Sequence, residues 1–400
     1  MDRIYHSLLL DHFRENRQMA FVSGPRQVGK TTTACEGLPS FLYLNWDRAP
    51  DRLLITGNEE ALRARLQMDV LQASRRRVVF DELHKYARWK AFLKGFFDAT
   101  EDRLEITVTG SARLNVYRRG GDSLMGRYFL YRMHPLSLSE LARTSLPDKS
   151  PVRPPVALPH EAFLSLLQFG GFPEPFVRSD TRFYNRWRRL RNEQLFKEDI
   201  RDMTNIHELS QLEVLAALLQ HQVGQQVNYS TLAGSTGVSV DTIRRWLQVL
   251  ESVCFCFVVR PYHRNVPKSL RRQPKVFLWD WSLLSDPGAR HENMVASHLL
   301  KAVHFWTDAG LGDFDLFYLR DTAGREVDFL VTRGGVPWFL AEVKTSGGGR
   351  ISKSLAYYHR LLKTTHAFQV QIDEPYVDRD CFLETDPVQV PARTLLSQFI

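Results

Sequence analysis

A glycine-containing segment near the N-terminus has the residue types and spacing that hold a polyanion. After an apolar run at 19–22, the chain reads Gly24-Pro25-Arg26-Gln27-Val28-Gly29-Lys30-Thr31-Thr32, which contains a full G-x-x-x-x-G-K-[ST] pattern. The glycines let backbone N–H groups turn inward around phosphates, and the N-terminus of a following helix adds its positive dipole end. We expect Lys30 to reach the β- and γ-phosphates and the Thr31 hydroxyl to ligate Mg²⁺. The segment therefore predicts a site for ATP and Mg²⁺.

A second segment supplies two neighbouring carboxylates. Val78-Val79-Phe80 is typical of a short buried strand, and Asp81 and Glu82 follow it directly. We expect Asp81 to hold the magnesium ion through water, and Glu82 to polarise the attacking water as general base. Adjacent acids at a strand end are common on protein surfaces, but this pair follows a phosphate-binding loop. Together they predict hydrolysis and not binding alone.

Two further positions are candidates for sensing or stabilising the transferred phosphoryl group. A strand at 104–109 precedes Ser111, which we expect to sense the γ-phosphate, with Thr109 as the second choice and ordinary turn chemistry as the alternative. Arg127 is the expected arginine finger, acting in cis or across a subunit boundary. Arg113 competes for that role, and a plain surface arginine is the alternative for Arg127.

The C-terminal part contains a constellation of acids and one lysine. Asp328 lies on an expected strand, a Gly-Gly turn follows, and Glu342 and Lys344 are two residues apart on the partner strand, so they share a face. Glu292 lies on an expected earlier helix. This order matches the PD-(D/E)XK nuclease pattern, in which Asp328 and Glu342 would bind Mg²⁺ and Lys344 would position the water. Cleavage is a separate question, because such folds also serve as DNA-binding or structural modules.

Residues 228–252 are typical of a helix-turn-helix. Ser239 is placed as an N-cap, and the outer side of the second helix presents Thr242, Arg244 and Arg245. A wing is expected to follow, with strands at 254–259 and 276–279 joined by a basic loop that contains His263, Arg264, Lys268, Arg271, Arg272 and Lys275. This arrangement favours contact with a nucleic-acid backbone, although winged helices also serve as spacers between proteins. The outer face of the second helix lacks an Asn or Gln to pair with adenine, so sequence-specific reading is not expected.

Five segments in order resemble a known group of proteins: GPRQVGKTT, VVFDEL, TGSARL, GRYFLYRMHPLSLSEL and GGFPEPF. The chain resembles the bacterial and archaeal AAA-type ATPases fused to a C-terminal nuclease-like domain of unknown function. The resemblance implies an ATPase core close to the AAA+ and STAND classes, and a ring that we expect to be a hexamer. It also implies that the G-x-P motif ending at Pro173 touches the nucleotide base; from the residues alone, the same motif is simply a helix break.

The expected fold is α/β with four parts. A P-loop AAA-type ATPase core covers 1–145, and a proline-rich linker with a helical lid covers 146–205. A winged helix follows at 206–279, and a restriction-endonuclease-like α/β domain at 280–400. The linker is extended because five prolines fall between 144 and 159. The helix at 181–202 carries many arginines, which indicates either a nucleic-acid contact or a solvated face.

The composition excludes several classes of protein. The 400 residues are 44% hydrophobic and 24% charged, which excludes a wholly disordered chain, and no apolar run is long enough to span a membrane. Four cysteines exclude a disulfide scaffold and favour a reducing cytoplasm. The net charge of +8 permits an acidic partner. We expect ATP-driven remodelling of DNA; the alternatives are an ATP-gated nuclease of a restriction or defence type and a STAND-like regulator.

Overall fold

The computed structural model describes the chain except for residues 37–40, 58, 71–74, 101–102, 112–123, 201–208, 264–272 and 347–348. The described residues form two compact units. The first contains 1–134 and 144–146, and the second contains 135–143 and 147–400. No helix of the described part is long and apolar enough to cross a membrane.

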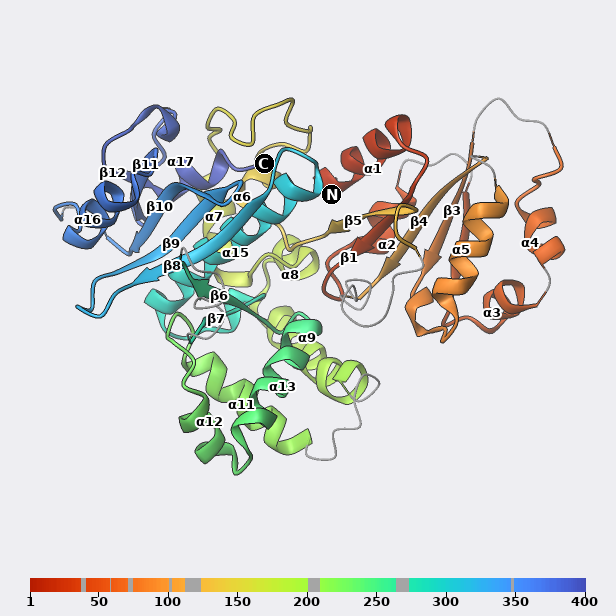
Figure 1. The fold of residues 1–400 in the computed structure, drawn as a ribbon, viewed down its shortest axis with the longest axis horizontal. Helices are drawn as coiled ribbons and strands as arrows, with labels where there is room; N and C mark the ends of the chain where they lie inside the picture. The colour runs from red at the N-terminus through yellow and green to blue at the C-terminus, as the bar shows by residue number, and fades with distance from the viewer. Residues whose placement is uncertain are drawn as a thin grey trace. The chain divides into compact units, whose positions relative to one another are not determined.

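The first unit is built on a sheet of five parallel strands in the order β2-β3-β4-β1-β5 (Figure 1). Their bounds are β1 Met19–Ser23, β2 Phe41–Asn45, β3 Arg76–Asp81, β4 Leu104–Gly110 and β5 Tyr128–Arg132. All five residues of β1 are buried, as are Val78, Val79 and Phe80 of β3. Such continuous apolar runs are typical of parallel strands covered on both faces. The strands expected at 19–22, 78–80 and 104–109 are therefore confirmed.

Helices cover this sheet: α1 Ile4–Glu15, α2 Lys30–Cys35, α3 Ala49–Thr56, α4 Glu59–Arg65 and α5 Trp89–Thr100, with a short 3₁₀ turn η1 at Leu83–Lys85. Phe92 and Phe96 of α5 meet Phe80 edge to face, at ring distances of 5.6 Å each. The apolar core of this unit therefore lies beneath the strand that carries the two expected catalytic acids.

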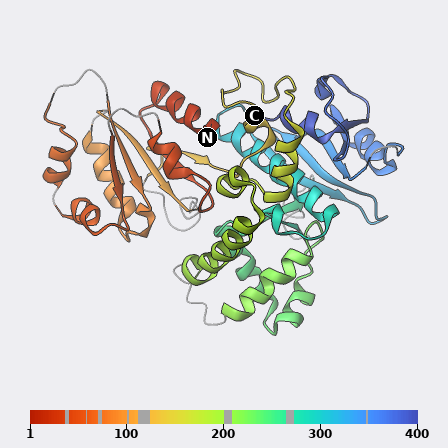
Figure 2. The same cartoon turned by 180° about the vertical axis from the view of Figure 1, so that it is seen from behind.

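The second unit begins with α6 Leu138–Ala142 and continues with many helices: α7 His160–Phe169, α8 Pro173–Arg178, α9 Thr181–Gln194, a π-helical turn η3 Leu195–Ile200, α11 Leu209–His221, α12 Tyr229–Thr236 and α13 Val240–Ser252. Helices α11, α12 and α13 pack on one another, and Figure 2 shows them in green from behind. Helices α12 and α13 lie where the sequence predicts the two helices of this motif, and its role as a winged helix stays a prediction. Ser239 caps α13 by accepting from the Thr242 N–H at 3.1 Å, and Gly237 adopts the left-handed conformation in the turn.

The rest of the second unit is a seven-stranded sheet in the order β12-β11-β10-β9-β8-β6-β7. Its strands are β6 Cys256–Pro261, β7 Lys275–Leu278, β8 Phe314–Arg320, β9 Glu326–Arg333, β10 Val336–Lys344, β11 His366–Gln371 and β12 Val388–Pro391. The remaining elements are η4 Trp281–Leu283, α15 Pro287–Asp308, α16 Lys353–Leu362, η5 Cys381–Leu383 and α17 Ala392–Ser397. The expected wing strands β6 and β7 thus form the edge of this sheet, and the domain boundary at 279/280 stays a prediction.

A buried ion pair fixes the start of the second unit. Lys301 of α15 bonds to Glu140 of α6, and both side chains are almost fully shielded from solvent. Lys301 Nζ also donates to Pro135 O at 2.9 Å, and the ring of His298 accepts from the Leu138 N–H at 3.0 Å. A buried charge needs such partners, because its hydration is lost. Helix α15 therefore anchors residues 135–140 to the body of this unit.

Candidate functional site

The phosphate-binding loop runs from the end of β1 to the start of α2, as expected. Gly24 lies against the chain that follows β5, since a Cβ built on it would sit 2.2 Å from Met133 O. Gly29 has a φ of 97° and precedes the first residue of α2, Lys30. Both glycines are therefore required by geometry: one by a close approach of backbone, and the other by a left-handed conformation.

Lys30 lies inside this loop. Its ammonium donates to Gly24 O at 3.0 Å and to Pro25 O at 2.7 Å, and the side chain is buried. Arg3, near the start of the chain, stabilises the loop. Its guanidinium donates to Val28 O in the loop and, at 2.6 Å, to His134 O after β5. Sequence reasoning missed Arg3, since no motif links it to the loop.

Asp81 is the centre of a hydrogen-bond network at the carboxyl ends of the strands. Its carboxylate accepts from Thr31 Oγ1 at 3.0 Å, from Tyr43 OH at 2.7 Å and from Thr109 Oγ1. The donors come from α2, β2 and β4. Burial, reinforced by the nearby Asp81 charge, raises the pKa of Tyr43, so this phenol stays protonated and remains a donor. The network holds the expected magnesium residues, Thr31 and Asp81, next to each other.

These two side chains fit a magnesium ion. Thr31 and Asp81 present hard oxygen atoms within 3.0 Å of each other, directly beside the loop that contains Lys30. Mg²⁺ prefers such oxygen donors and keeps several waters when it binds with a nucleotide. The described residues therefore offer a donor set of the kind that nucleotide-bound magnesium uses.

Glu82 directly follows β3 and has a left-handed backbone with a φ of 56°. That conformation is unfavourable for a residue with a side chain and often marks functional sites. Its N–H donates to Thr109 O at 3.1 Å, and its carboxylate pairs with Lys85 at 3.3 Å. Burial lowers the pKa of Lys85, but its partners Asp47 and Glu82 outweigh burial and raise that pKa overall. Lys85 therefore stays protonated and holds the Glu82 carboxylate by an ion pair.

The two sensor candidates have different neighbours. Thr109 at the end of β4 donates to Asp81 and is fully buried. Ser111, the first choice from sequence, lies 3.2 Å from His84 Nε2 instead. Of the two candidates, Thr109 and not Ser111 therefore belongs to the hydrogen-bond network around Asp81 in the described part of the chain.

Arg127 does not lie near the phosphate-binding loop. It precedes β5, at the edge of the sheet where β1 begins, because Met19 N–H donates to Arg127 O. Its guanidinium makes a two-point ion pair with Asp98 of α5, at 2.7 and 2.9 Å. The expectation of a finger acting in cis is therefore wrong: the loop follows the carboxyl ends of the parallel strands, and Arg127 lies at their amino ends. A role across a subunit boundary stays a prediction.

The last residue of β5 is an arginine at the same end of the sheet as the phosphate-binding loop. Arg132 is paired in register with Ser23, the residue before the loop. Sequence reasoning missed it, although its place at the end of a strand parallel to β1 is a signal that could have found it. Arg113 lies outside the described residues.

The expected DNA-contacting residues are only partly within the described chain. Arg244 and Arg245 are exposed on α13, and Arg244 pairs with Asp241 at 3.2 Å. Thr242 is half-buried beside the Ser239 cap. Pro173 begins α8 in the second unit, and its contact with a base stays a prediction. The remaining four, Arg264, Lys268, Arg271 and Arg272, lie outside the described residues.

The four residues of the expected nuclease pattern, Glu292, Asp328, Glu342 and Lys344, lie in one cluster. A fifth residue, Lys275, lies among them. Its ammonium is 3.2 Å from Glu292, 2.6 Å from Glu326 and 3.7 Å from Asp328. Sequence reasoning placed Lys275 in an exposed basic wing. That expectation is wrong, because Lys275 is the first residue of β7 and is only 2% exposed.

The remaining members of the cluster pair with each other. Glu342 bonds to Lys344 at 2.8 Å, and its second oxygen is buried without a hydrogen-bond partner in the described part. Asp328 accepts from the Val343 N–H at 2.8 Å. Burial, with the nearby Asp328 charge, raises the pKa of Glu292 to about 7 despite the attraction of Lys275. The carboxylates thus share a strongly desolvated site with an internal cation.

This cluster does not fit a divalent metal as it stands. Within the described ranges, no group of three or more His, Cys, Asp or Glu side chains is placed to hold a metal ion. An ammonium group between the carboxylates already supplies a positive charge and would repel a second cation. The structure therefore assembles the expected residues but puts Lys275 among them.

Three family models match consecutive regions of the chain. Residues 16–142 match the family model of AAA domains. Two domains of unknown function match the rest, DUF8612 over residues 160–287 and DUF4143 over residues 287–380. An uncharacterized protein of Mycobacterium tuberculosis is 23% identical over 345 residues, covering 84% of this chain and 72% of that protein. One of Methanocaldococcus jannaschii is 21% identical over 329 residues, covering 78% and 71%.

Two solved structures are also similar. The Walker-type ATPase of Pyrococcus abyssi aligns with a TM-score of 0.40 and 14% identity, over 72% of this chain and 94% of that one. The Orc1 protein of Aeropyrum pernix, solved in complex with DNA, aligns with a TM-score of 0.31 and 13% identity, over 72% and 90%.

Residues 16–142, which match the AAA-domain model, contain the P-loop and its strand-end acid. The chain joins this AAA domain to two regions that match domains of unknown function.

The Asp81 network predicts different effects for the two sensor candidates. Thr109→Val removes a hydroxyl donor to a buried carboxylate, a loss of about 1.5–3 kcal/mol, so we expect the ATPase kcat to fall roughly 10- to 100-fold. Ser111→Ala leaves the Asp81 network intact and should change kcat little. Steady-state ATP hydrolysis by both variants checks this, and a larger loss in Ser111→Ala would show that the serine is the sensor.

The Lys275 cluster predicts an effect on stability and on metal binding. Lys275→Met leaves three carboxylates that are 19–26% exposed without their cation, so we expect a loss of up to about 3 kcal/mol in the free energy of unfolding. Lys344→Met removes an ammonium that is 47% exposed and pairs with a single carboxylate, the buried Glu342, so we expect a smaller loss than in Lys275→Met.

The metal measurement uses an Asp81→Asn parent, so that the nucleotide site contributes little. Mn²⁺ should raise the Tm of the Lys275→Met variant, because the ion replaces the lost ammonium, and should leave the Tm of the parent unchanged. An equal rise in the parent would show that the cluster binds metal with Lys275 in place.

Proposed function

We propose that this chain is an ATP-hydrolysing, DNA-binding AAA-type ATPase that remodels or translocates on DNA as a ring, which we expect to be a hexamer. The observation that carries the hydrolytic part is the contact between Thr31 and Asp81 beside the buried ammonium of Lys30. It joins the loop that would hold the phosphates to the strand end that would hold the metal.

The residues of this chain divide the work as follows. Lys30 binds and orients the terminal phosphates, while Thr31 and Asp81 hold the magnesium ion that arrives with ATP. That ion supplies positive charge to the phosphate oxygens when bound. Glu82 accepts the proton of the attacking water, and Lys85, 3.3 Å away, orients its carboxylate.

The DNA-binding part of the proposal is supported by α13. Its Ser239 cap, its apolar face of buried residues and its exposed Arg244 and Arg245 are the features of a helix that lies against a nucleic-acid backbone. Arginine at such a surface binds phosphate oxygens through several N–H donors. The ring part of the proposal uses Arg127 as a finger from a neighbouring subunit, and Pro173 as the contact to the base.

DNA should stimulate ATP hydrolysis. We would measure the ATPase rate with single-stranded, duplex and four-way DNA, and the affinity for each DNA at several salt concentrations. A double Arg244→Gln, Arg245→Gln variant should lose stimulation and reduce the slope of log K against log salt by about one for each lost phosphate contact. Arg360→Gln, at an exposed position on α16, is the matched control. An ATPase rate that no DNA changes would contradict the proposal.

A Mg²⁺-dependent nuclease is the second candidate. The observation that favours it is the meeting of Glu292, Asp328, Glu342 and Lys344 in one cluster, with one oxygen of Glu342 lacking a partner in the described part. Cleavage would require Lys275 to leave the carboxylates. Incubation of DNA with Mg²⁺ and ATP, with Asp328→Ala as the comparison, decides between the two: DNA cut by the wild type alone favours the nuclease.

A further inference from the structure

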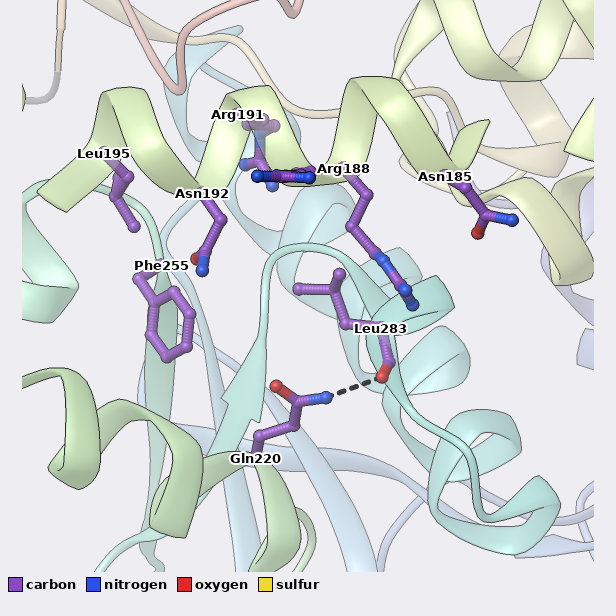
Figure 3. Close-up of a pocket in the computed structure, with 9 residues that line it drawn as sticks. Asn185, Arg188, Arg191, Asn192, Leu195, Gln220, Phe255 and Leu283 are labelled. Carbon is purple, nitrogen blue, oxygen red and sulfur yellow. Dashed lines mark hydrogen bonds between the residues drawn. The ribbon is translucent and has the colours of Figure 1, made fainter. Parts of the chain in front are cut away.

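The second unit contains a cavity of about 500 Å³ beneath one face of α9 (Figure 3). Arg188, Arg189 and Arg191 of this helix line it, together with Asn185 and Asn192 from the same face. In Figure 3 the helix covers the upper side, and residues from α11, η4 and the segment before β6 close the lower side. No carboxylate is among the described residues that line it. The cavity is therefore a concave site with three guanidinium groups.

One of these arginines is fixed in place by buried partners. Arg191 lies 3.9 Å above the ring of Phe172 and pairs at 3.5 Å with Asp280, which is buried behind it. These contacts leave the Arg191 side chain only 16% exposed. A guanidinium that is already oriented loses little conformational entropy on binding a ligand.

The cavity keeps a positive charge after its ion pairs are counted. Arg191 is paired with Asp280, and Arg189 pairs with Glu193 at 3.2 Å. Arg188 lies 5.6 Å from the centre of the Tyr184 ring, and no carboxylate of the described chain is within ion-pair distance of it. An anion in this cavity would therefore meet Arg188 as its main charged partner.

Neutral groups of the cavity suit phosphate oxygens as well. The amides of Asn185 and Asn192 line it, and Gln220 is held by donating to Leu283 O at 2.7 Å. A neighbouring cavity of about 220 Å³ shares Asn192 and Gln220 but is lined by two carboxylates, which disfavour an anion there. Arginine and amide donors around a partly apolar space are the groups that recognise phosphate esters.

We propose that this α9 cavity binds the phosphate group of a nucleotide or of a DNA backbone. The site lies entirely in the second unit and does not use the phosphate-binding loop, so it goes beyond the proposed ATPase. For the arginine-rich helix, the proposal assigns Arg188, Arg189 and Arg191, which line the cavity, to ligand binding, and leaves Arg186, which does not line it, on the solvated face.

The test uses the full chain with Lys30→Ala, which weakens the P-loop, and titrates it with pyrophosphate, ADP and a single-stranded oligonucleotide. Loss of a charged hydrogen-bond donor costs about 1.5–3 kcal/mol, so Arg188→Gln should weaken binding roughly 10- to 100-fold. Arg186→Gln, exposed on α9 but outside the cavity, should bind as the parent does. Asn192→Asp, which adds a negative charge to the wall, should also weaken binding and serves if Arg188→Gln fails to fold.

The ligands distinguish the two sources of phosphate. If the site binds DNA, Arg188→Gln weakens the oligonucleotide complex and pyrophosphate competes with it. If it binds a free nucleotide, Arg188→Gln weakens ADP and pyrophosphate binding and leaves DNA affinity unchanged. Either result supports the site. Equal affinities in the Arg188→Gln and Arg186→Gln variants would overturn the site and leave the ATPase proposal untouched. No saturable binding of any of the three ligands would also overturn the site, and would count against the DNA-binding part of the proposed function as well, whereas ATP hydrolysis by the wild type tests the hydrolytic part separately.

Discussion

The nucleotide site depends on one buried carboxylate. Asp81 ends β3 and accepts hydrogen bonds from hydroxyl groups on α2, β2 and β4, contributed by Thr31, Tyr43 and Thr109. A carboxylate removed from water is costly unless donors replace its hydration. These donors replace it and, at the same time, fix the P-loop helix against the strand end. The requirement to satisfy one charge thus holds the P-loop helix and the end of β3 together.

In the second unit, lysines compensate the charges of carboxylates that are removed from water. Glu140 is neutralised by Lys301, and Lys275 supplies one positive charge to the acids around Asp328. In both places the positive charge belongs to a buried side chain of the protein. Removal of either lysine would leave unpaired carboxylates in a desolvated site, which is far more costly than the loss of a surface pair. The C-terminal cluster is therefore coherent as a structural element without a metal ion.

Sequence patterns predicted the parts that are encoded locally. The P-loop and Asp81 follow from fixed spacings next to apolar strands, and the capped helix of the helix-turn-helix follows from Ser239. Contacts across the sheet had no such signal: the bond from Tyr43 depends on β2 lying beside β3. Arg127 was misplaced because sequence order does not show at which edge of a parallel sheet a residue lies. Lys275 was misplaced because a lysine among basic residues resembles an exposed loop, whereas strand pairing buries it.

The central claim is that Glu82, beside the Asp81 network, is the base of an ATP-hydrolysing site. The most direct test is single-turnover hydrolysis of ATP by Glu82→Gln beside the wild type, with ATP affinity measured on both proteins. The change keeps the shape of the side chain and removes its ability to accept a proton. We predict unchanged ATP binding with hydrolysis reduced to a residual rate. Hydrolysis at the wild-type rate in Glu82→Gln would contradict this account.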